Sequence, residues 1–175
     1  MSDSIDAAVE AINDLRKCEG NRVVLKREQL LAVKNLLNGK DVLAVLPTGF
    51  GKSMIFTVFS FAKRELLKRT GQAEAVSILV VSPLKSLIED QIMELRSLSC
   101  SAEYLKSENL PQISESPPQF IYCTAEKAID KDFFERLKTT RESFTKALPQ
   151  LLLMRPTLWK HGRGNGKLVI SMKYH

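Results

Sequence analysis

Apolar residues along this chain follow two kinds of spacing, one typical of helices and one typical of strands. Near the start they recur every three or four residues, which predicts an amphipathic helix over residues 3–18: Ile5, Val9, Ile12, Leu15. Residues 76–81 instead form a continuous apolar run (Val-Ser-Ile-Leu-Val-Val), as in a strand covered on both faces. The same reasoning predicts further helices at 27–38, 52–68, 86–98 and 125–137, strands at 41–46, 102–105 and 120–123, and a Ser-, Glu- and Pro-rich loop at 107–119.

Strands that alternate with helices indicate βαβ units, and therefore an α/β fold with a mostly parallel sheet flanked by helices. Ligands of such sheets bind at the carboxyl ends of the strands. With 175 residues, 44% of them apolar, the chain is expected to form one domain with a buried core. It has no apolar run long enough to cross a bilayer and no secretory signal, and three scattered cysteines favour a reducing, intracellular location.

The charge is distributed unevenly and marks a boundary near Glu142. All 20 acidic residues lie between Asp3 and Glu142, together with 20 of the 26 Lys and Arg, so this stretch is neutral. The net charge of +6 comes entirely from the tail that follows, which also holds both histidines and the single Trp159. We therefore take the charge as a sign of a boundary and not as a sign of DNA binding.

Residues 47–53 read Pro-Thr-Gly-Phe-Gly-Lys-Ser between a predicted strand and a predicted helix, which is the arrangement of a phosphate-binding loop. Backbone N–H groups and the helix dipole favour an anion there, and glycine lets the backbone approach it closely. The loop predicts an ATP and Mg²⁺ site in which Lys52 reaches the β- and γ-phosphates and Ser53 holds the metal. Thr48, Gly49, Phe50 and Gly51 complete it. The plain alternative is a glycine turn with a surface lysine.

Together with other segments, this loop resembles the RecQ family of superfamily 2 DNA helicases. Upstream, residues 25–29 (Leu-Lys-Arg-Glu-Gln) are similar to the family's adenine-reading motif, in which a basic residue and a glutamine flank the base. The resemblance implies that Lys26 and Gln29 bind the adenine side of ATP, and the Gln29 amide offers both a donor and an acceptor. The family usually has an aromatic residue where Leu25 stands, and Phe50 replaces a small residue. The implied fold is a RecA-like P-loop domain.

Two further segments resemble the family's DNA-contacting motifs. Residues 82–91 (Ser-Pro-Leu-Lys-Ser-Leu-Ile-Glu-Asp-Gln) are similar to its motif Ia, and residues 122–126 (Tyr-Cys-Thr-Ala-Glu) are similar to its Tyr-x-Thr-Pro-Glu. The resemblance implies weak contacts to the DNA backbone, made by these residues: Ser82, Pro83, Lys85, Ser86, Thr124. Simple strand-to-helix turns are the alternative reading of both segments.

The resemblance stops where the family's Walker B motif, Asp-Glu-x-His, is due. No Asp-Glu dipeptide occurs in the chain, and a second motor domain is missing, so we expect an incomplete RecA-like domain without its Walker B strand and without catalysis. The apolar residues 151–154 could still take that strand's place. We expect poor order beyond about residue 155, and an exposed apolar edge that promotes aggregation.

A shifted reading frame accounts for the tail. One nucleotide sequence that encodes residues 150–166 also reads, from the third base of the Gln150 codon, Ala-Ile-Val-Asp-Glu-Ala-His-Thr-Val-Glu-Thr-Trp-Thr-Gly-Lys-Arg. Met154 and Trp159, which have a single codon each, are compatible with it. A genuine basic tail is the alternative.

The sequence therefore predicts an N-terminal helix at 1–19, a partial helicase ATP-binding domain at 20–148 and an aberrant basic tail at 149–175. The first functional hypothesis is the ATP-binding part of a RecQ-like 3′-to-5′ DNA helicase, inactive in this form. In full-length relatives the resemblance implies an intracellular, nuclear role in DNA repair and recombination. The second hypothesis is a non-catalytic nucleotide- or DNA-binding module, which binds without turnover. A third, an unrelated P-loop kinase, has no support from motif Ia.

Overall fold

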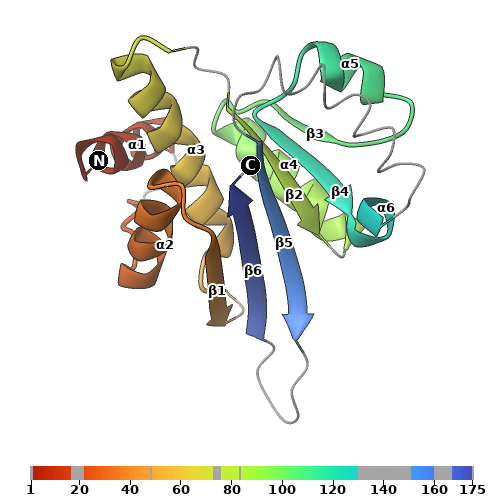
Figure 1. Ribbon diagram of the computed structural model, residues 1–175, viewed down its shortest axis with the longest axis horizontal. Coiled ribbons are helices and arrows are strands. Elements are labelled where there is room, and N and C mark those ends of the chain that lie inside the picture. The colour runs from red at the N-terminus through yellow and green to blue at the C-terminus, as the bar shows by residue number, and fades with distance from the viewer. Residues whose placement is uncertain are drawn as a thin grey trace.

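The computed structural model describes residues 2–16, 22–47, 49–72, 76–82, 84–129, 151–159 and 167–174, and in the last two ranges it describes only the backbone. Six helices and six strands lie within these ranges (Figure 1). The helices are α1 (Ser2–Leu15), α2 (Arg27–Leu37), α3 (Lys52–Arg69), α4 (Lys85–Ser97), α5 (Leu110–Glu115) and α6 (Ala125–Ile129). The strands are β1 (Val42–Pro47), β2 (Ser77–Ser82), β3 (Ala102–Tyr104), β4 (Phe120–Thr124), β5 (Leu151–Trp159) and β6 (Lys167–Tyr174). None of the described helices is long and apolar enough to span a membrane.

The predicted elements are confirmed up to β4, with small shifts at their ends, except in one loop. Within the stretch predicted as loop, Leu110–Glu115 forms the short helix α5. The prediction was wrong because only two apolar residues, Leu110 and Ile113, mark its buried face, and both pack against the sheet. Asn109 fixes the entry to α5, since its side chain accepts from the Lys106 N–H at 2.7 Å and donates to the Tyr104 carbonyl at 2.9 Å. The prediction of a helix to residue 137 extends into residues 130–150, which lie outside the described residues.

The strands form one sheet in the order β1-β6-β5-β2-β4-β3. The pairs β2–β4, β3–β4 and β2–β5 are parallel, whereas β6 lies antiparallel between β1 and β5. All strands except β6 consequently run in one direction, and their carboxyl ends meet at the lower edge in Figure 1. The predicted α/β fold with a mostly parallel sheet is confirmed.

β5 lies beside β2, at the position where we expected the missing Walker B strand. Its residues 151–154 pair with residues 77–80 of β2, so the apolar run fills the strand position without the acidic motif. Farther along, the backbone of residues 156–159 and 167–174 lies in strands. β6 pairs with β5 on one side and β1 on the other, and this pairing satisfies backbone groups that would otherwise be exposed.

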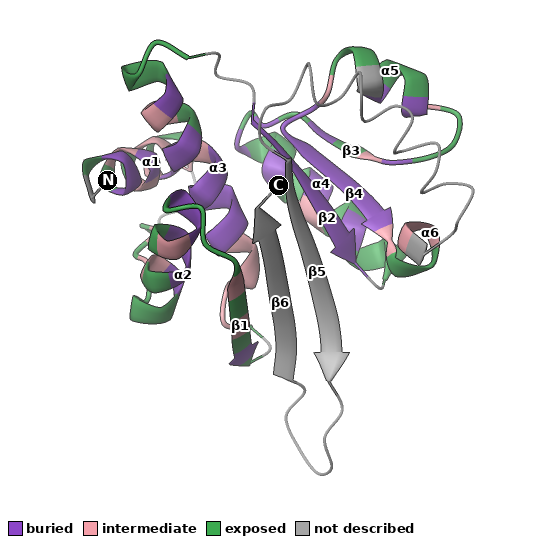
Figure 2. Ribbon diagram, in the orientation of Figure 1, coloured by how far each residue is buried: buried purple, intermediate pink, exposed green. Residues whose placement is uncertain are grey.

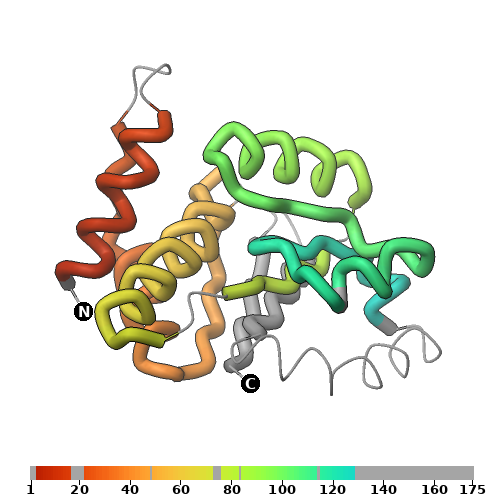
Figure 3. The backbone as a smooth tube through the Cα atoms, turned by 90° about the horizontal axis from the view of Figure 1, so that it is seen from above, coloured from red at the N-terminus to blue at the C-terminus, as the bar shows by residue number. Residues whose placement is uncertain are grey.

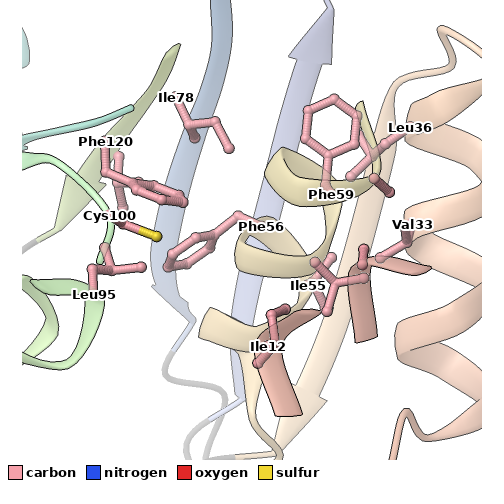
Figure 4. Packing of buried hydrophobic residues seen from close by; sticks show 14 of the residues in the cluster. Ile12, Val33, Leu36, Ile55, Phe56, Phe59, Ile78, Leu95, Cys100 and Phe120 are labelled. Carbon is pink, nitrogen blue, oxygen red and sulfur yellow. The ribbon is translucent and has the colours of Figure 1, made fainter. Parts of the chain in front are cut away.

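Helices cover the two faces of the sheet unequally. On one face, α1, α2, α3 and α4 enclose the larger apolar cluster, which includes Phe56, Phe59 and Phe120 (Figures 3 and 4). The rings of Phe56 and Phe120 lie 6.0 Å apart. The other face carries a smaller cluster of β2 and β4 residues against α5 and α6. β2 is buried along its whole length (Figure 2), whereas β1, at the edge of the sheet, leaves Leu43 and Val45 exposed at 68% and 49%.

Candidate nucleotide and nucleic-acid site

The loop between β1 and α3 has the backbone conformation of a phosphate-binding loop. Gly49 and Gly51 have φ angles of 76° and 83°, a region that side chains with a Cβ rarely adopt. The chain turns sharply between them, and the Phe50 N–H donates to the Pro47 carbonyl at 3.3 Å. Helix α3 then begins at Lys52. Thr48, which was also assigned to this loop, lies outside the described residues.

The amino end of α3 offers donors to an anion. The N–H of Met54 turns back to the Gly51 carbonyl at 3.1 Å, but those of Lys52 and Ser53 have no partner among the described residues. The first turn of α3 contains no acidic residue. Free N–H groups and the positive end of the helix dipole thus point out of the same turn. This arrangement fits phosphate oxygens.

Lys52 is held against the end of β1. Its ammonium donates to the carbonyls of Pro47 at 2.5 Å and Leu46 at 3.3 Å, and partial burial lowers the pKa of Lys52 below its ordinary value. A desolvated ammonium gains more from an anionic partner than an exposed one does. Ser53, the next residue, is half-buried and presents a hydroxyl at the same turn. Phosphate and one Mg²⁺ ligand therefore fit the residues present, although the described chain supplies no carboxylate here.

Gln29 lies under the phosphate loop and not at its surface. It is 4% exposed, and its amide nitrogen donates to the carbonyls of Gly51 at 2.8 Å and Phe50 at 3.1 Å. Its amide oxygen accepts from the Lys26 N–H at 2.8 Å, which caps the start of α2. Both amide hydrogens are therefore engaged, and one acceptor lone pair remains. In this arrangement Gln29 could accept from a base but could donate to it only by releasing a loop carbonyl.

Lys26 contacts the same loop from outside. Its ammonium lies 4.1 Å from the centre of the Phe50 ring and 3.4 Å from the Phe50 carbonyl oxygen. Phe50 is half-buried and, like Leu25, packs against the larger cluster. The structure thus brings Lys26 and Gln29 to the phosphate loop, as their positions upstream of it suggested. The sequence analysis missed that Phe50 joins them, although an aromatic residue in place of a small one was the available signal.

Two of the predicted DNA-contacting residues, Ser82 and Thr124, lie at the carboxyl ends of β2 and β4, at the same edge of the sheet as the phosphate loop but separated from it by β5 and β6. Ser82 and Thr124 are register partners. Ser82 is buried, and its hydroxyl has no hydrogen-bond partner in the described part of the chain. Thr124 is half-buried and accepts a long bond, 3.4 Å, from the Lys127 N–H.

The turn that leads from β2 into α4 is open to solvent. Lys85 and Ser86 are both exposed at the first turn of α4, whereas Pro83 lies outside the described residues. The structure thus pairs Ser82 with Thr124 and leaves Lys85 and Ser86 free to meet a ligand from solution. A phosphate group could contact this end of the sheet only at its surface, because Ser82 is covered.

Most of the chain matches a known protein family. The sequence model of the DEAD/DEAH box helicase family matches residues 26–153, which include Lys26, Gln29, the phosphate loop and the ends of β2 and β4. The chain belongs to the DEAD/DEAH box helicase family. The match covers the helices and strands from α2 to β4 and ends inside β5.

Individual helicases of the RecQ type are similar to parts of the chain. The ATP-dependent DNA helicase hus2/rqh1 of Schizosaccharomyces pombe is 36% identical over 83 residues, which are 47% of this chain and 6% of that protein. The ATP-dependent DNA helicase Q-like 2 of Arabidopsis thaliana is 32% identical over 66% of this chain and 14% of its own length. The ATP-dependent DNA helicase RecQ of Haemophilus influenzae is 28% identical over 68% of this chain and 19% of its own length. The chain thus spans less than a fifth of these relatives.

The catalytic acid of a helicase is missing from the described part of this family member. β5 carries no Asp or Glu, and no group of three His, Cys, Asp or Glu residues that could hold a metal occurs within the described ranges. The acids nearest in sequence to the matched motifs are Glu89, Asp90 and Glu126, which are exposed on α4 and α6. The described part of the site offers groups suited to a nucleotide but no carboxylate that would position water beside a γ-phosphate.

Proposed function

We propose that this chain binds ATP with Mg²⁺ at the loop between β1 and α3, as the ATP-binding portion of a RecQ-like 3′-to-5′ DNA helicase, and that it does not hydrolyse ATP at a helicase-like rate. The observation that carries the proposal is the turn at Gly49 and Gly51, with Lys52 and the free N–H groups of α3 around it. Such a turn favours an anion through fixed dipoles and one ammonium.

Each residue has a distinct part in the proposed complex. Lys52 exchanges its two carbonyl partners for the β- and γ-phosphate oxygens, while Ser53 gives its hydroxyl to Mg²⁺. Thr48, Gly49, Phe50 and Gly51 supply the backbone of the loop. Lys26 and Gln29 lie on the side where the base would bind. The free lone pair of the Gln29 amide suits the exocyclic amino group of adenine and disfavours the carbonyl of guanine at that position.

DNA binding is proposed to be weak and made through the phosphate backbone. The turn after β2 offers Lys85, Ser86 and, outside the described residues, Pro83, and Ser82 and Thr124 lie at the ends of adjacent strands. One lysine can neutralise few phosphates, so affinity should fall steeply with salt. By extension from full-length helicases of this type, we place the protein in the nucleus, in DNA repair and recombination.

The absence of turnover is proposed from the sequence of β5. Its residues 151–154 fill the strand position beside β2 with apolar side chains where the family's acidic motif is due, and the family match ends at residue 153. A frame shift near residue 149 accounts for both facts, and a genuine basic tail is the alternative. The nucleotide sequence across residues 148–166 decides between them.

A second candidate function is a binding module that never turns over ATP. It is favoured by the sheet itself, which β5 and β6 complete without any catalytic acid. Both candidates predict no turnover by the chain as it stands, so a further measurement separates them. If the chain is the front part of a motor, restoring the shifted frame and adding a second motor domain should give ATP hydrolysis that rises with single-stranded DNA and is lost in Lys52→Ala, whereas a binding module should stay inactive.

The proposal is tested by titrating the purified chain with ATP and GTP in the presence of Mg²⁺ and by assaying ATP hydrolysis with and without DNA. We expect ATP to bind more tightly than GTP, Lys52→Ala to weaken binding strongly, and no DNA-stimulated turnover. Equal affinity for the two nucleotides would remove the adenine-reading role of Gln29. Turnover that depends on Lys52 would refute the assignment of an inactive site.

A further inference from the structure

Phe50 contacts both residues on the base side of the phosphate loop. Its carbonyl oxygen accepts from the Gln29 amide at 3.1 Å and from the Lys26 ammonium at 3.4 Å, and the same ammonium lies 4.1 Å from the centre of its ring. The neighbouring carbonyl of Gly51 accepts from Gln29 at 2.8 Å. A single residue of the loop therefore joins two side chains of the α2 region, more than twenty residues away in sequence.

Ordinary packing does not explain this contact. Lys26 is exposed, and an exposed lysine normally keeps its ammonium in water with most of its rotamers open. Here a ring face and a carbonyl both attract it, and the electrostatic attraction of a cation to an aromatic face requires the π system, not merely an apolar side chain. Leu25 contacts the same cluster, so the apolar packing of this corner does not depend on Phe50 alone.

We propose that Phe50 is a positioning residue that couples the phosphate loop to the base side of the nucleotide site, by holding the Lys26 ammonium at the loop. The inference rests on the proposed binding of a purine nucleotide. A loop that shifts when phosphate binds carries the Phe50 carbonyl and ring with it, so Lys26 and Gln29 follow. Recognition of the phosphates and of the nucleoside part is then no longer independent, whereas a ligand without a nucleoside gains nothing from Lys26.

The test compares variants that separate the π face from apolar bulk. Phe50→Tyr keeps the ring, Phe50→Leu keeps an apolar side chain, and Lys26→Met keeps the stem but not the charge. Affinities for ADP and for inorganic tripolyphosphate are measured by calorimetry in each variant and in the double variant Lys26→Met/Phe50→Leu. A cation–π contact at a solvent-accessible position corresponds to a change of about two- to fivefold in affinity.

We expect Phe50→Leu and Lys26→Met each to weaken ADP binding by about two- to fivefold. The double variant should bind ADP no more weakly than either single variant. Phe50→Tyr should match the wild type, and tripolyphosphate affinity should not change in any variant. Any of three results would overturn the coupling: the two single effects on ADP affinity multiply in the double variant, Phe50→Leu keeps the wild-type affinity for ADP, or tripolyphosphate loses as much affinity as ADP does. None of these results would contradict nucleotide binding itself. A wild-type chain that binds neither ligand would instead refute the proposed function.

A second readout does not depend on the nucleotide. The ring current of Phe50 should shift the NMR signals of the Lys26 methylene next to the ammonium in the free chain, in the wild type and in Phe50→Tyr but not in Phe50→Leu. Identical signals in all three proteins would show that the ammonium does not lie over the ring, which would overturn the inference even if nucleotide binding fails.

Discussion

The phosphate loop and the turn after β2 lie at the same edge of the sheet, but they are held in different ways. The loop is braced from both sides: Gln29 and Lys26 bind the carbonyls of Phe50 and Gly51, and Lys52 binds those of Leu46 and Pro47. In the turn after β2, Leu84, Lys85, Ser86 and Leu87 are all exposed, and the first buried residue is Ile88. Its N–H donates to the Leu84 carbonyl at 3.2 Å.

The phosphate loop is therefore a preorganised site, whereas the turn after β2 is an exposed one. Fixed donors and a constrained loop lower the entropy that a ligand must remove on binding, so the phosphate loop is suited to affinity. An exposed helix start with one lysine can contact a flexible polyanion in several registers, which is suited to weak, salt-sensitive contact. Similar motif matches in sequence thus correspond to different degrees of preorganisation.

The largest expected effect comes from removing the Lys52 ammonium of the phosphate loop. Lys52→Ala should weaken ATP binding by about tenfold to a hundredfold, because hydrogen bonds to a charged group contribute about 1.5–3 kcal/mol each. Calorimetric titration measures it. Lys85→Ala, the matched change in the turn after β2, should leave ATP affinity unchanged. A comparable loss of ATP affinity in both variants would show that the two regions are not distinct.

The next effect tests whether Gln29 depends on the space left by Gly51. A Cβ at Gly51 would lie 2.9 Å from the Gln29 amide nitrogen, whereas Gly39, with a similar φ of 71°, has nothing within 4 Å. Both Gly51→Ala and Gly39→Ala should lower the free energy of unfolding by about 1–2 kcal/mol through backbone strain. Only Gly51→Ala should also weaken nucleotide binding, as measured by titration beside thermal unfolding. Equal nucleotide affinity in the two variants would contradict the bracing role of Gln29.

A smaller effect concerns DNA. Lys85→Ala should lower the slope of log affinity against log salt by about one, because one phosphate contact is lost. Fluorescence anisotropy with single-stranded DNA at several salt concentrations measures the slope. Lys68→Ala is the control, since Lys68 is also exposed but lies near the other end of α3, away from the carboxyl edge of the sheet. The same change of slope in both variants would mean that binding follows overall charge and not the turn.

The smallest expected effect is on pH dependence. In the chain without ligand, burial lowers the pKa of Lys52 below its ordinary value of 10.5, and a bound phosphate favours the charged form and raises the pKa again. Between these two pKa values, binding takes up a proton, so affinity for ADP should fall as pH rises through the alkaline range. The stability of the chain without ligand depends on pH in the opposite direction. Between the lowered pKa of Lys52 and its ordinary value, the unfolded chain binds more protons than the folded one, so the free energy of unfolding rises with pH.

The pH effect is checked with Lys52→Arg, in which the guanidinium stays charged over the same range. Titrations at matched pH values should show a falling affinity for the wild type and a flat one for the arginine variant. Parallel profiles would assign the pH dependence to the phosphate ligand and not to Lys52.

The local patterns of the chain were sufficient for much of this description. Alternating apolar runs and helical spacing predicted every described element from α1 to β4 except α5, and the glycines with Lys52 and Ser53 marked the phosphate loop. These features depend on neighbouring residues: period, turn residues and helix starts. The missing Asp-Glu dipeptide is likewise visible in the sequence alone, since such a motif depends only on neighbouring residues.

Only the tertiary structure decided which of these residues meet. Gln29 could have read a base from the surface, but the packing of α2 against α3 buries it beneath Phe50 and Gly51. The pairing of Ser82 with Thr124, and of β5 with β2, depends on strand order, which local spacing does not encode. α5 escaped prediction for the same reason: two apolar side chains suffice to hold a short helix only where a sheet already offers them an apolar face.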